Sequence, residues 1–147
     1  MPAVGRKEQK MASASQVHYV NPATLNRNPA FTNVVVVSGS ARTIHIGGQD
    51  SVDASGTIIG KGDIQAQTAQ VLKNIQAALA AAGADLHHLI KWNMFVVQGQ
   101  DLRAGFAVFQ KVWGNRPNPP AISFAFVTGL ANPDFLIEMD AIAVIPE

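Results

Sequence analysis

Two predicted strands are apolar on both of their faces. Residues 34–37 are four consecutive valines, and in residues 121–128 both alternating sets of side chains are mostly apolar. Strands of this kind are buried on both faces, but two helices, the number predicted below, cover only one face of a sheet. Leaving the other face wet costs free energy in proportion to its apolar area. The pattern therefore predicts that another copy of the chain covers this face.

The composition of the chain agrees with self-association. Charged residues make up 14% of the 147 residues, against roughly 25% in typical soluble domains. No run of 18 uninterrupted apolar residues occurs, so a membrane-spanning segment is not expected. The length predicts one domain. Cysteine is absent, which excludes disulfides, thiolate metal sites and a cysteine nucleophile.

The amino-terminal segment is small and polar, and it carries most of the excess positive charge. Residues 1–16 contain no apolar core of a signal peptide, and we predict a disordered tail followed by one domain over residues 17–147, in a cytoplasmic protein. Residues 1–10 could be an added leader. Beyond residue 10 there are 8 basic and 9 acidic groups. A nucleic-acid partner is not expected, because it would require a basic folded surface.

The order of predicted elements is that of an α+β domain. Valine-rich residues 34–37 and residues 43–47 read as a hairpin, followed by a short edge strand within residues 51–59. Asp63 and Asp101 are predicted helix N-caps. The remaining elements are two helices ending near Gly83 and Gly114 and three strands at residues 89–97, 121–128 and 135–145.

Two acidic side chains share one face of the last strand. Glu138 and Asp140 are two residues apart and alternate with apolar neighbours. Carboxylates in an apolar strand are costly unless they are paired or hydrogen-bonded. They could form a general acid–base or water-orienting pair, or a structural salt bridge, for instance with Lys91. Gly47 and Gly48 at a strand end could admit a ligand or mark a bulge.

Other polar and aromatic residues leave two interpretations open. The adjacent His87 and His88 are expected to point apart, and the four histidines show no metal-ligand spacing. Arg42 and Arg116 are expected in loops, as solvated charges or as an anion clamp. The aromatic residues of the second helix are expected in its core, with one of them free to protrude into a pocket.

Several short motifs occur in an order that resembles the reactive intermediate deaminase A (RidA, or YjgF) family. The carboxyl-terminal part of the resemblance is the run Pro120-Ala121-Ile122-Ser123, Gly129-Leu130 and residues 136–144. Upstream, the matching positions are Pro29-Ala30-Phe31, Gly62-Asp63, Gln67, Asn74-Ile75 and Ala82-Gly83-Ala84. The resemblance covers about residues 29–145.

The resemblance implies a chorismate-mutase-like α+β fold, with two helices on one face of the sheet and a homotrimer formed through the other. It implies a cleft between subunits, where active members hydrolyse enamines and imines to 2-keto acids and ammonia without a metal or cofactor. Glu138 matches the family's water-positioning glutamate, and Gly48 its strand-end glycine. At the position of the family's carboxylate-binding arginine, this chain has Ile122.

Two further positions of the implied cleft are also apolar here. Phe31 stands where the family has a tyrosine, and Phe106 falls at a substrate-contacting asparagine, whereas backbone donors at Phe124 persist whatever its side chain. Isoleucine cannot replace the bidentate arginine–carboxylate contact.

Three functions follow from the resemblance. The sequence favours a trimer whose clefts bind a small, less polar ligand, or that serves only as a scaffold. The alternative is an enamine/imine deaminase, a hydrolase in which Arg42 or Arg116 of a neighbouring subunit replaces the arginine. A ribonuclease activity, also attached to this family, is disfavoured by the lack of a basic face.

Overall fold

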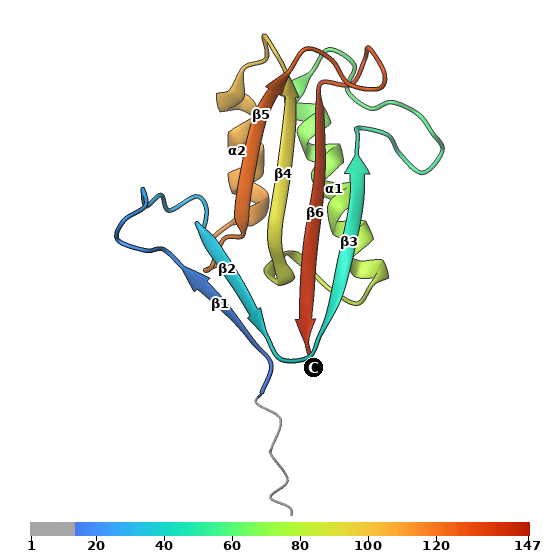
Figure 1. Ribbon diagram of the computed structural model, residues 1–147. Coiled ribbons are helices and arrows are strands. Elements are labelled where there is room, and N and C mark those ends of the chain that lie inside the picture. Colours follow the sequence, from blue (N-terminus) through green and yellow to red (C-terminus); the bar gives the residue numbers. More distant parts are fainter. Residues whose placement is uncertain (1–13) are drawn as a thin grey trace, which may run out of the picture.

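A four-stranded sheet forms the centre of the protein, in the order β3-β6-β4-β5 (Figure 1). The computed structural model describes residues 14–147. β6 pairs antiparallel with β3 and β4, whereas β4 and β5 run parallel. The strand bounds are β3 (Ala41–Gln49), β4 (Leu89–Val97), β5 (Ala121–Val127) and β6 (Ile137–Pro146). The strands predicted at residues 89–97, 121–128 and 135–145 are thus present, the last with its start moved to residue 137.

Both helices, α1 (Ile64–Ala81) and α2 (Leu102–Trp113), lie on one face of this sheet (Figure 1). Their predicted N-caps are confirmed: the Asp63 carboxylate accepts hydrogen bonds from two backbone N–H groups of α1, and that of Asp101 accepts one from Arg103 at 3.0 Å. A capping side chain satisfies donors that the first helical turn leaves free. No helix of residues 14–147 is long and apolar enough to cross a membrane.

The hydrophobic core lies between the helices and the sheet. Trp92 of β4 is fully buried, and its ring centroid lies 5.1 Å from that of Phe109 in α2. Cross-strand pairing places Ala141 of β6 and Ile122 of β5 beside Trp92, on the same face of the sheet. The α1 side chains in this core are Ile64, Val71, Leu72, Ile75 and Leu79. The face toward the helices is therefore closed by the chain itself.

One buried polar side chain ties α1 to two loops. The amide nitrogen of Gln67 donates to the carbonyl oxygens of Gly60, at 3.1 Å, and Asp134, at 2.9 Å. Its amide oxygen accepts from the backbone N–H of Leu136 at 2.8 Å. Gln67 is 0% exposed, so these bonds are made away from water. They fix the segments that precede α1 and β6.

A separate two-stranded ribbon precedes the sheet, and it replaces the predicted hairpin. β2 (Val34–Ser38) pairs with β1 (Gln16–Val20), whereas β3 pairs with β6. The chain turns at Gly39, which has a φ of 79°, but β2 and β3 then diverge (Figure 1). The hairpin prediction was wrong because β3 finds a longer apolar partner in β6 than β2 offers.

Two smaller expectations also fall in this part of the chain. The edge strand predicted within residues 51–59 is reduced to one bridge between Val52 and Ile58. Between them the Asp53 carboxylate accepts from two backbone N–H groups and closes a turn. Most of the predicted tail lies outside the described residues, but Gln16 begins β1 and the Ser15 hydroxyl donates to the Glu147 carbonyl oxygen at 2.6 Å.

The sheet face away from the helices is not covered within residues 14–147. Pairing places Asn93 opposite Asp140, and Phe95 opposite Glu138, on this open face. The two acidic residues are thus on one face, as their spacing predicted, and the buried Ile137 and Met139 lie on the other.

Candidate functional site

An apolar pocket of about 270 Å³ lies between β5 and α2 on the helix side of the sheet. Its lining residues are Ala30, Phe31, Ile64, Thr68, Met94, Val96, Leu102, Gly105, Phe106, Phe109, Ile122, Phe124, Ile137 and Met139. None of them is charged, and the single hydroxyl among them, that of Thr68, donates to the Ile64 carbonyl oxygen at 2.7 Å. The pocket therefore offers a ligand apolar contacts and no free side-chain donor.

Three sequence-predicted residues, two from β5 and one from α2, line the apolar pocket. Ile122 and Phe124 point toward the helices because they pair with Trp92 and Met94, whose side chains are buried there. Phe106 reaches the pocket from α2. The polar positions that the resemblance assigns to a substrate cleft thus form one apolar wall.

A loop holds Phe31, the fourth predicted residue, at the same pocket. The backbone N–H of Thr32 donates to the Pro120 carbonyl oxygen at 3.1 Å, and the Thr32 hydroxyl donates to that of Pro119 at 2.5 Å. Because Thr32 is 3% exposed, these bonds fix the loop against the start of β5. Phe31 lines the pocket without filling it.

The remaining predicted site residues, Gly48 and Glu138, lie on the opposite, open face of the sheet. A Cβ atom at residue 48 would stand 3.0 Å from Cδ of Glu138 and 3.1 Å from its Oε1. Only glycine leaves this space, so the carboxylate is seated directly on the β3 backbone. The glycine allows close approach of a side chain from the same subunit.

Asp50 also lies at this position on the open face, beside Glu138, and it was not among the residues predicted from the sequence. The register of β3 and β6 shifts between Ile46 and Gln49, and Asp50 then lies beside Glu138. Partial burial, the negative charge of Glu138 and a hydrogen bond between the two carboxyl groups raise the pKa of Asp50 from 3.8 to about 6. Its Oδ1 atom is buried and has no donor among the described residues. The signal in the sequence was an acidic residue directly after Gly47-Gly48-Gln49.

Replacing Asp50 by asparagine is expected to stabilise the protein at neutral pH. A folded-state pKa above the unfolded value stabilises the fold below about pH 4, and this contribution is lost as the pH rises through about 6. Asp50→Asn removes the penalty of the ionised form, which we place at about 1 kcal/mol because the side chain is only partly buried. The free energy of unfolding in urea, measured at pH values on both sides of this range, should show the gain only at the higher pH.

The matched control is Asp53→Asn, at a nearby acidic residue. Hydrogen bonds from Ser55 and Thr57 hold the pKa of Asp53 below its usual value, so its replacement should have the opposite sign at neutral pH. A gain for Asp50→Asn of equal size at both pH values would contradict the assignment.

The structure does not bring Ile122 and Glu138 together in one chain. Ile122 pairs with Trp92 and faces the helices, whereas Glu138 pairs with Phe95 and faces away from them. Their strands present opposite faces at these positions, so the predicted cleft between subunits that is lined by both stays a prediction. A cleft that contains both side chains requires a second copy of the chain.

The alternative salt bridge between Lys91 and the acidic pair is not formed either. The Lys91 ammonium donates to the Ser123 hydroxyl at 2.7 Å, and the Asn93 amide donates to Asp140 at 2.7 Å. Asp140 therefore has a neutral partner, and the open face carries a polar strip across β5, β4 and β6.

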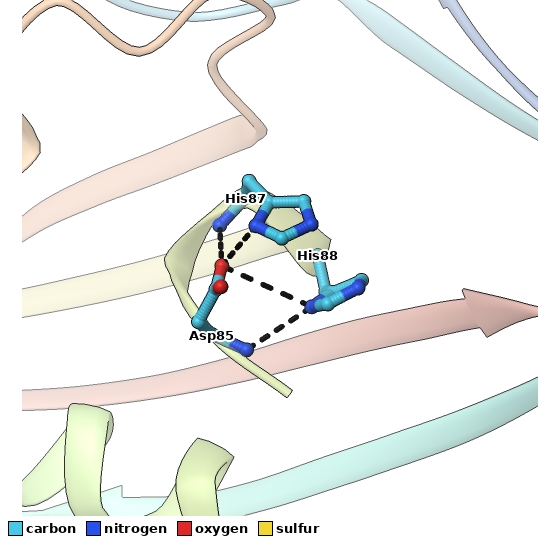
Figure 2. Close-up of side chains that lie close together, drawn as sticks. All are labelled: Asp85, His87 and His88. Atoms are coloured by element: carbon cyan, nitrogen blue, oxygen red, sulfur yellow. Dashed lines mark hydrogen bonds and ion pairs between the residues drawn. The ribbon is translucent and has the colours of Figure 1, made fainter. Parts of the chain in front are cut away.

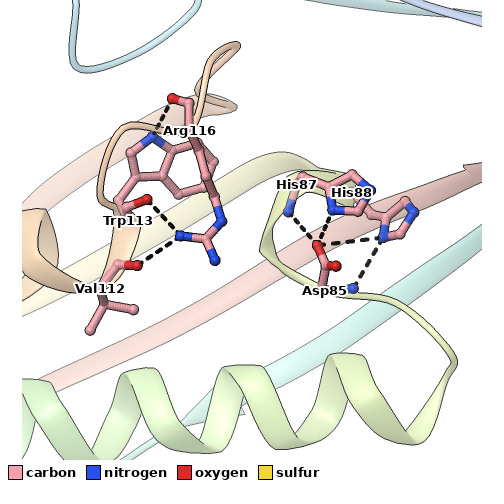
Figure 3. A network of polar contacts seen from close by, with 6 residues as sticks. All are labelled: Asp85, His87, His88, Val112, Trp113 and Arg116. Carbon is pink, nitrogen blue, oxygen red and sulfur yellow. Dashed lines mark hydrogen bonds and ion pairs between the residues drawn. The ribbon is translucent and has the colours of Figure 1, made fainter.

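Both candidate arginines are placed by the structure. Arg42 lies in β3, not in a loop, opposite Ile145. Arg116 follows α2, and its Nη1 donates to the carbonyl oxygens of Val112, at 3.0 Å, and Trp113, at 2.6 Å (Figure 3). The Trp113 indole N–H donates back to the Arg116 carbonyl oxygen at 3.1 Å. Arg116 thus caps the carboxyl end of the helix.

A second group of polar side chains, Asp85, His87 and His88, offers three potential metal-ligand atoms within 4.8 Å of one another (Figure 2). The two rings do not point apart as expected, because their centroids lie 3.9 Å from each other. His88 Nδ1 accepts from the Asp85 backbone N–H at 3.0 Å, and the Asp85 carboxylate accepts from that of His87 at 2.9 Å. Desolvation, followed by the neighbouring His87, lowers the pKa of His88. These contacts form the capping box of the short helix η1 (Leu86–His88).

The element order, the helices on one face and the mixed sheet define an α+β protein with a chorismate-mutase-like fold. Residues 19–145 match the family described as Endoribonuclease L-PSP. A RutC family protein of Pyrococcus horikoshii is 38% identical over 100 residues, which are 68% of this chain and 77% of that protein. The chain therefore belongs to the RidA/YjgF family.

Solved structures of this family have the same fold. YyfB of Yersinia pestis, from the conserved Rid protein family, superposes with a TM-score of 0.76 at 31% identity, covering 88% of this chain and 98% of that chain. The YjgF gene product of E. coli superposes with a TM-score of 0.62 at 31% identity, covering 69% and 80% respectively.

Proposed function

We propose that this family member binds a small apolar molecule in the pocket between β5 and α2, at the boundary between two subunits of a homotrimer. One observation carries the proposal: every side chain that lines the pocket is uncharged, including Ile122 at the position of the family's arginine. A carboxylate entering there would lose its water and gain no charged partner. An apolar ligand gains free energy from the same surface.

Exposed aromatic side chains around the pocket support a position at a subunit boundary. Phe106 is 47% exposed and Phe124 45% exposed, and Leu102 and Phe126 are exposed beside them. Contiguous exposed apolar surface of this kind marks an interaction site. A second copy placed here would close the pocket and could bring its open face, with Glu138, toward Ile122.

Indole, a small uncharged aromatic molecule, is a suitable probe of the pocket. We expect Phe106→Ala to weaken its binding about tenfold, because a buried aromatic contact is worth about 1–3 kcal/mol. Leu25→Ala is the matched control, since Leu25 is a large apolar residue that is 49% exposed and does not line the pocket. The dissociation constants of indole for the wild type and both variants are measured by calorimetry. Equal constants for the two variants, or no binding to the wild type, would refute the proposal.

The assembly itself is tested by light scattering after size exclusion. We expect a particle of three times the chain's mass at micromolar concentration. The reason is that the open face of the sheet and the exposed aromatic side chains around the pocket are both expected to be buried against other subunits. Neither surface is covered by the chain's own described residues. A monomeric mass under these conditions would rule out the inter-subunit position of the pocket.

One observation supports the alternative function, that of an enamine/imine deaminase. Glu138 is seated at Gly48 beside Asp50, and a carboxyl pair that shares a proton could serve as a general acid and base. We place it second because residues 14–147 hold no arginine in the apolar pocket.

A further inference from the structure

A groove adjoins the apolar pocket and gives it a polar end. The groove, of about 700 Å³, shares the lining residues Ala30, Phe106 and Phe109 with the pocket. It then runs along the last turn of α2. Its polar lining residues are Asn28, Gln110, Asn115 and Arg116. A ligand that fills the pocket and extends past Phe106 therefore meets polar groups.

Arg116 is the one charged residue that lines either recess in the described part of the chain. A guanidinium has five N–H donors, and the two that Arg116 uses within residues 14–147 both come from Nη1, to the end of α2. It makes no ion pair with an acidic side chain of this region. Nε and Nη2 thus remain to bind oxygen atoms of a ligand.

The guanidinium is also held in place before any ligand arrives. Its Nη1 contacts two carbonyl oxygens of α2, and the indole N–H of Trp113 contacts the arginine's own carbonyl oxygen, so side chain and backbone are fixed from both ends (Figure 3). A fixed side chain loses little entropy on binding. Arg116 differs in this respect from a mobile surface arginine.

We propose that the ligand is an acid with an apolar body, whose body occupies the pocket and whose carboxylate binds Arg116 in the groove. This rests on the proposed function, since the body needs the pocket. A site with an arginine at residue 122 would bind the carboxylate against β5. In the arrangement proposed here, the apolar body of the ligand lies against β5, and its carboxylate lies in the groove.

The test compares two probes of similar shape, 4-phenylbutyrate and 4-phenylbutan-1-ol, by calorimetry at neutral pH. We expect the wild-type protein to bind the acid about fivefold more tightly than the alcohol, a modest factor because Arg116 is solvent-exposed. The preference should disappear in Arg116→Gln and persist in Lys111→Gln, which removes another basic residue from the last turn of α2. It should also decrease as sodium chloride screens the charge.

Arg116→Gln removes a helix cap, so circular dichroism must show that the variant is folded. Arg116→Lys keeps the charge and is expected to retain part of the preference. Equal binding of acid and alcohol to the wild type would overturn this inference and leave the proposed pocket standing. A preference that survives in Arg116→Gln would also overturn it. Absence of binding by both probes would overturn the proposed function as well.

Discussion

Gln67→Leu is expected to lower the free energy of unfolding by about 3 to 5 kcal/mol. Leucine has a similar volume, so the change creates no large cavity. It does remove the partners of three backbone groups, at Gly60, Asp134 and Leu136. A buried group left without a partner costs about 1–3 kcal/mol, and Gln67 has no contact with solvent. Urea denaturation followed by circular dichroism measures the loss.

Gln65→Leu is the matched control for this substitution. Gln65 lies one half-turn earlier in α1, and its side chain is exposed. The same chemical change there should alter the free energy of unfolding by less than about 0.5 kcal/mol. A loss of similar size at both positions would show that the effect comes from helix propensity and not from the three hydrogen bonds.

The helices could be predicted because their signals are local. Asp63 and Asp101 act on backbone groups within three residues, so the N-caps and the helix starts follow from a short window of sequence. Strand 89–97 was equally clear, since its apolar pattern is bounded on both sides. The sharing of one face by Glu138 and Asp140 follows from the two-residue repeat of a strand.

Strand partners and the composition of the site could not be predicted in the same way. β3 pairs with β6, about a hundred residues away, and the local valine run gave no sign that β2 would pair with β1 instead. Alternation assigns residues to faces within one strand but does not relate Ile122 on β5 to Glu138 on β6. The proximity of Asp50 to Glu138 depends on a register shift between Ile46 and Gln49. Gly47 and Gly48 allowed for a bulge there, but they did not indicate which residue the bulge would bring beside Glu138.

Ammonia release from freshly generated 2-iminopropionate is expected to equal the rate in buffer alone. The substrate's carboxylate has no charged partner in the apolar pocket, and an arginine–carboxylate fork is among the strongest polar contacts that a site can supply. Without this contact the imine is not held beside a general acid or base, and orientation is worth several powers of ten in rate. We therefore expect the absence of the arginine to abolish the acceleration of ammonia release from this substrate.

Ile122→Arg is the informative comparison in the same assay. Arginine at residue 122 would restore the fork, and Glu138 of a neighbouring subunit together with the backbone at Phe124 would complete the cleft. We expect this variant to release ammonia above the buffer rate, provided that it remains folded and assembled. Glu138→Gln in the variant should abolish the gain, because it removes the carboxylate that orients water.

The central claim is that an apolar site has replaced the family's anion site, and the wild-type rate with 2-iminopropionate tests it most directly. Ammonia should appear no faster with the protein than without it, at any protein concentration in the micromolar range. A tenfold acceleration that scales with protein concentration would contradict the claim and establish the deaminase.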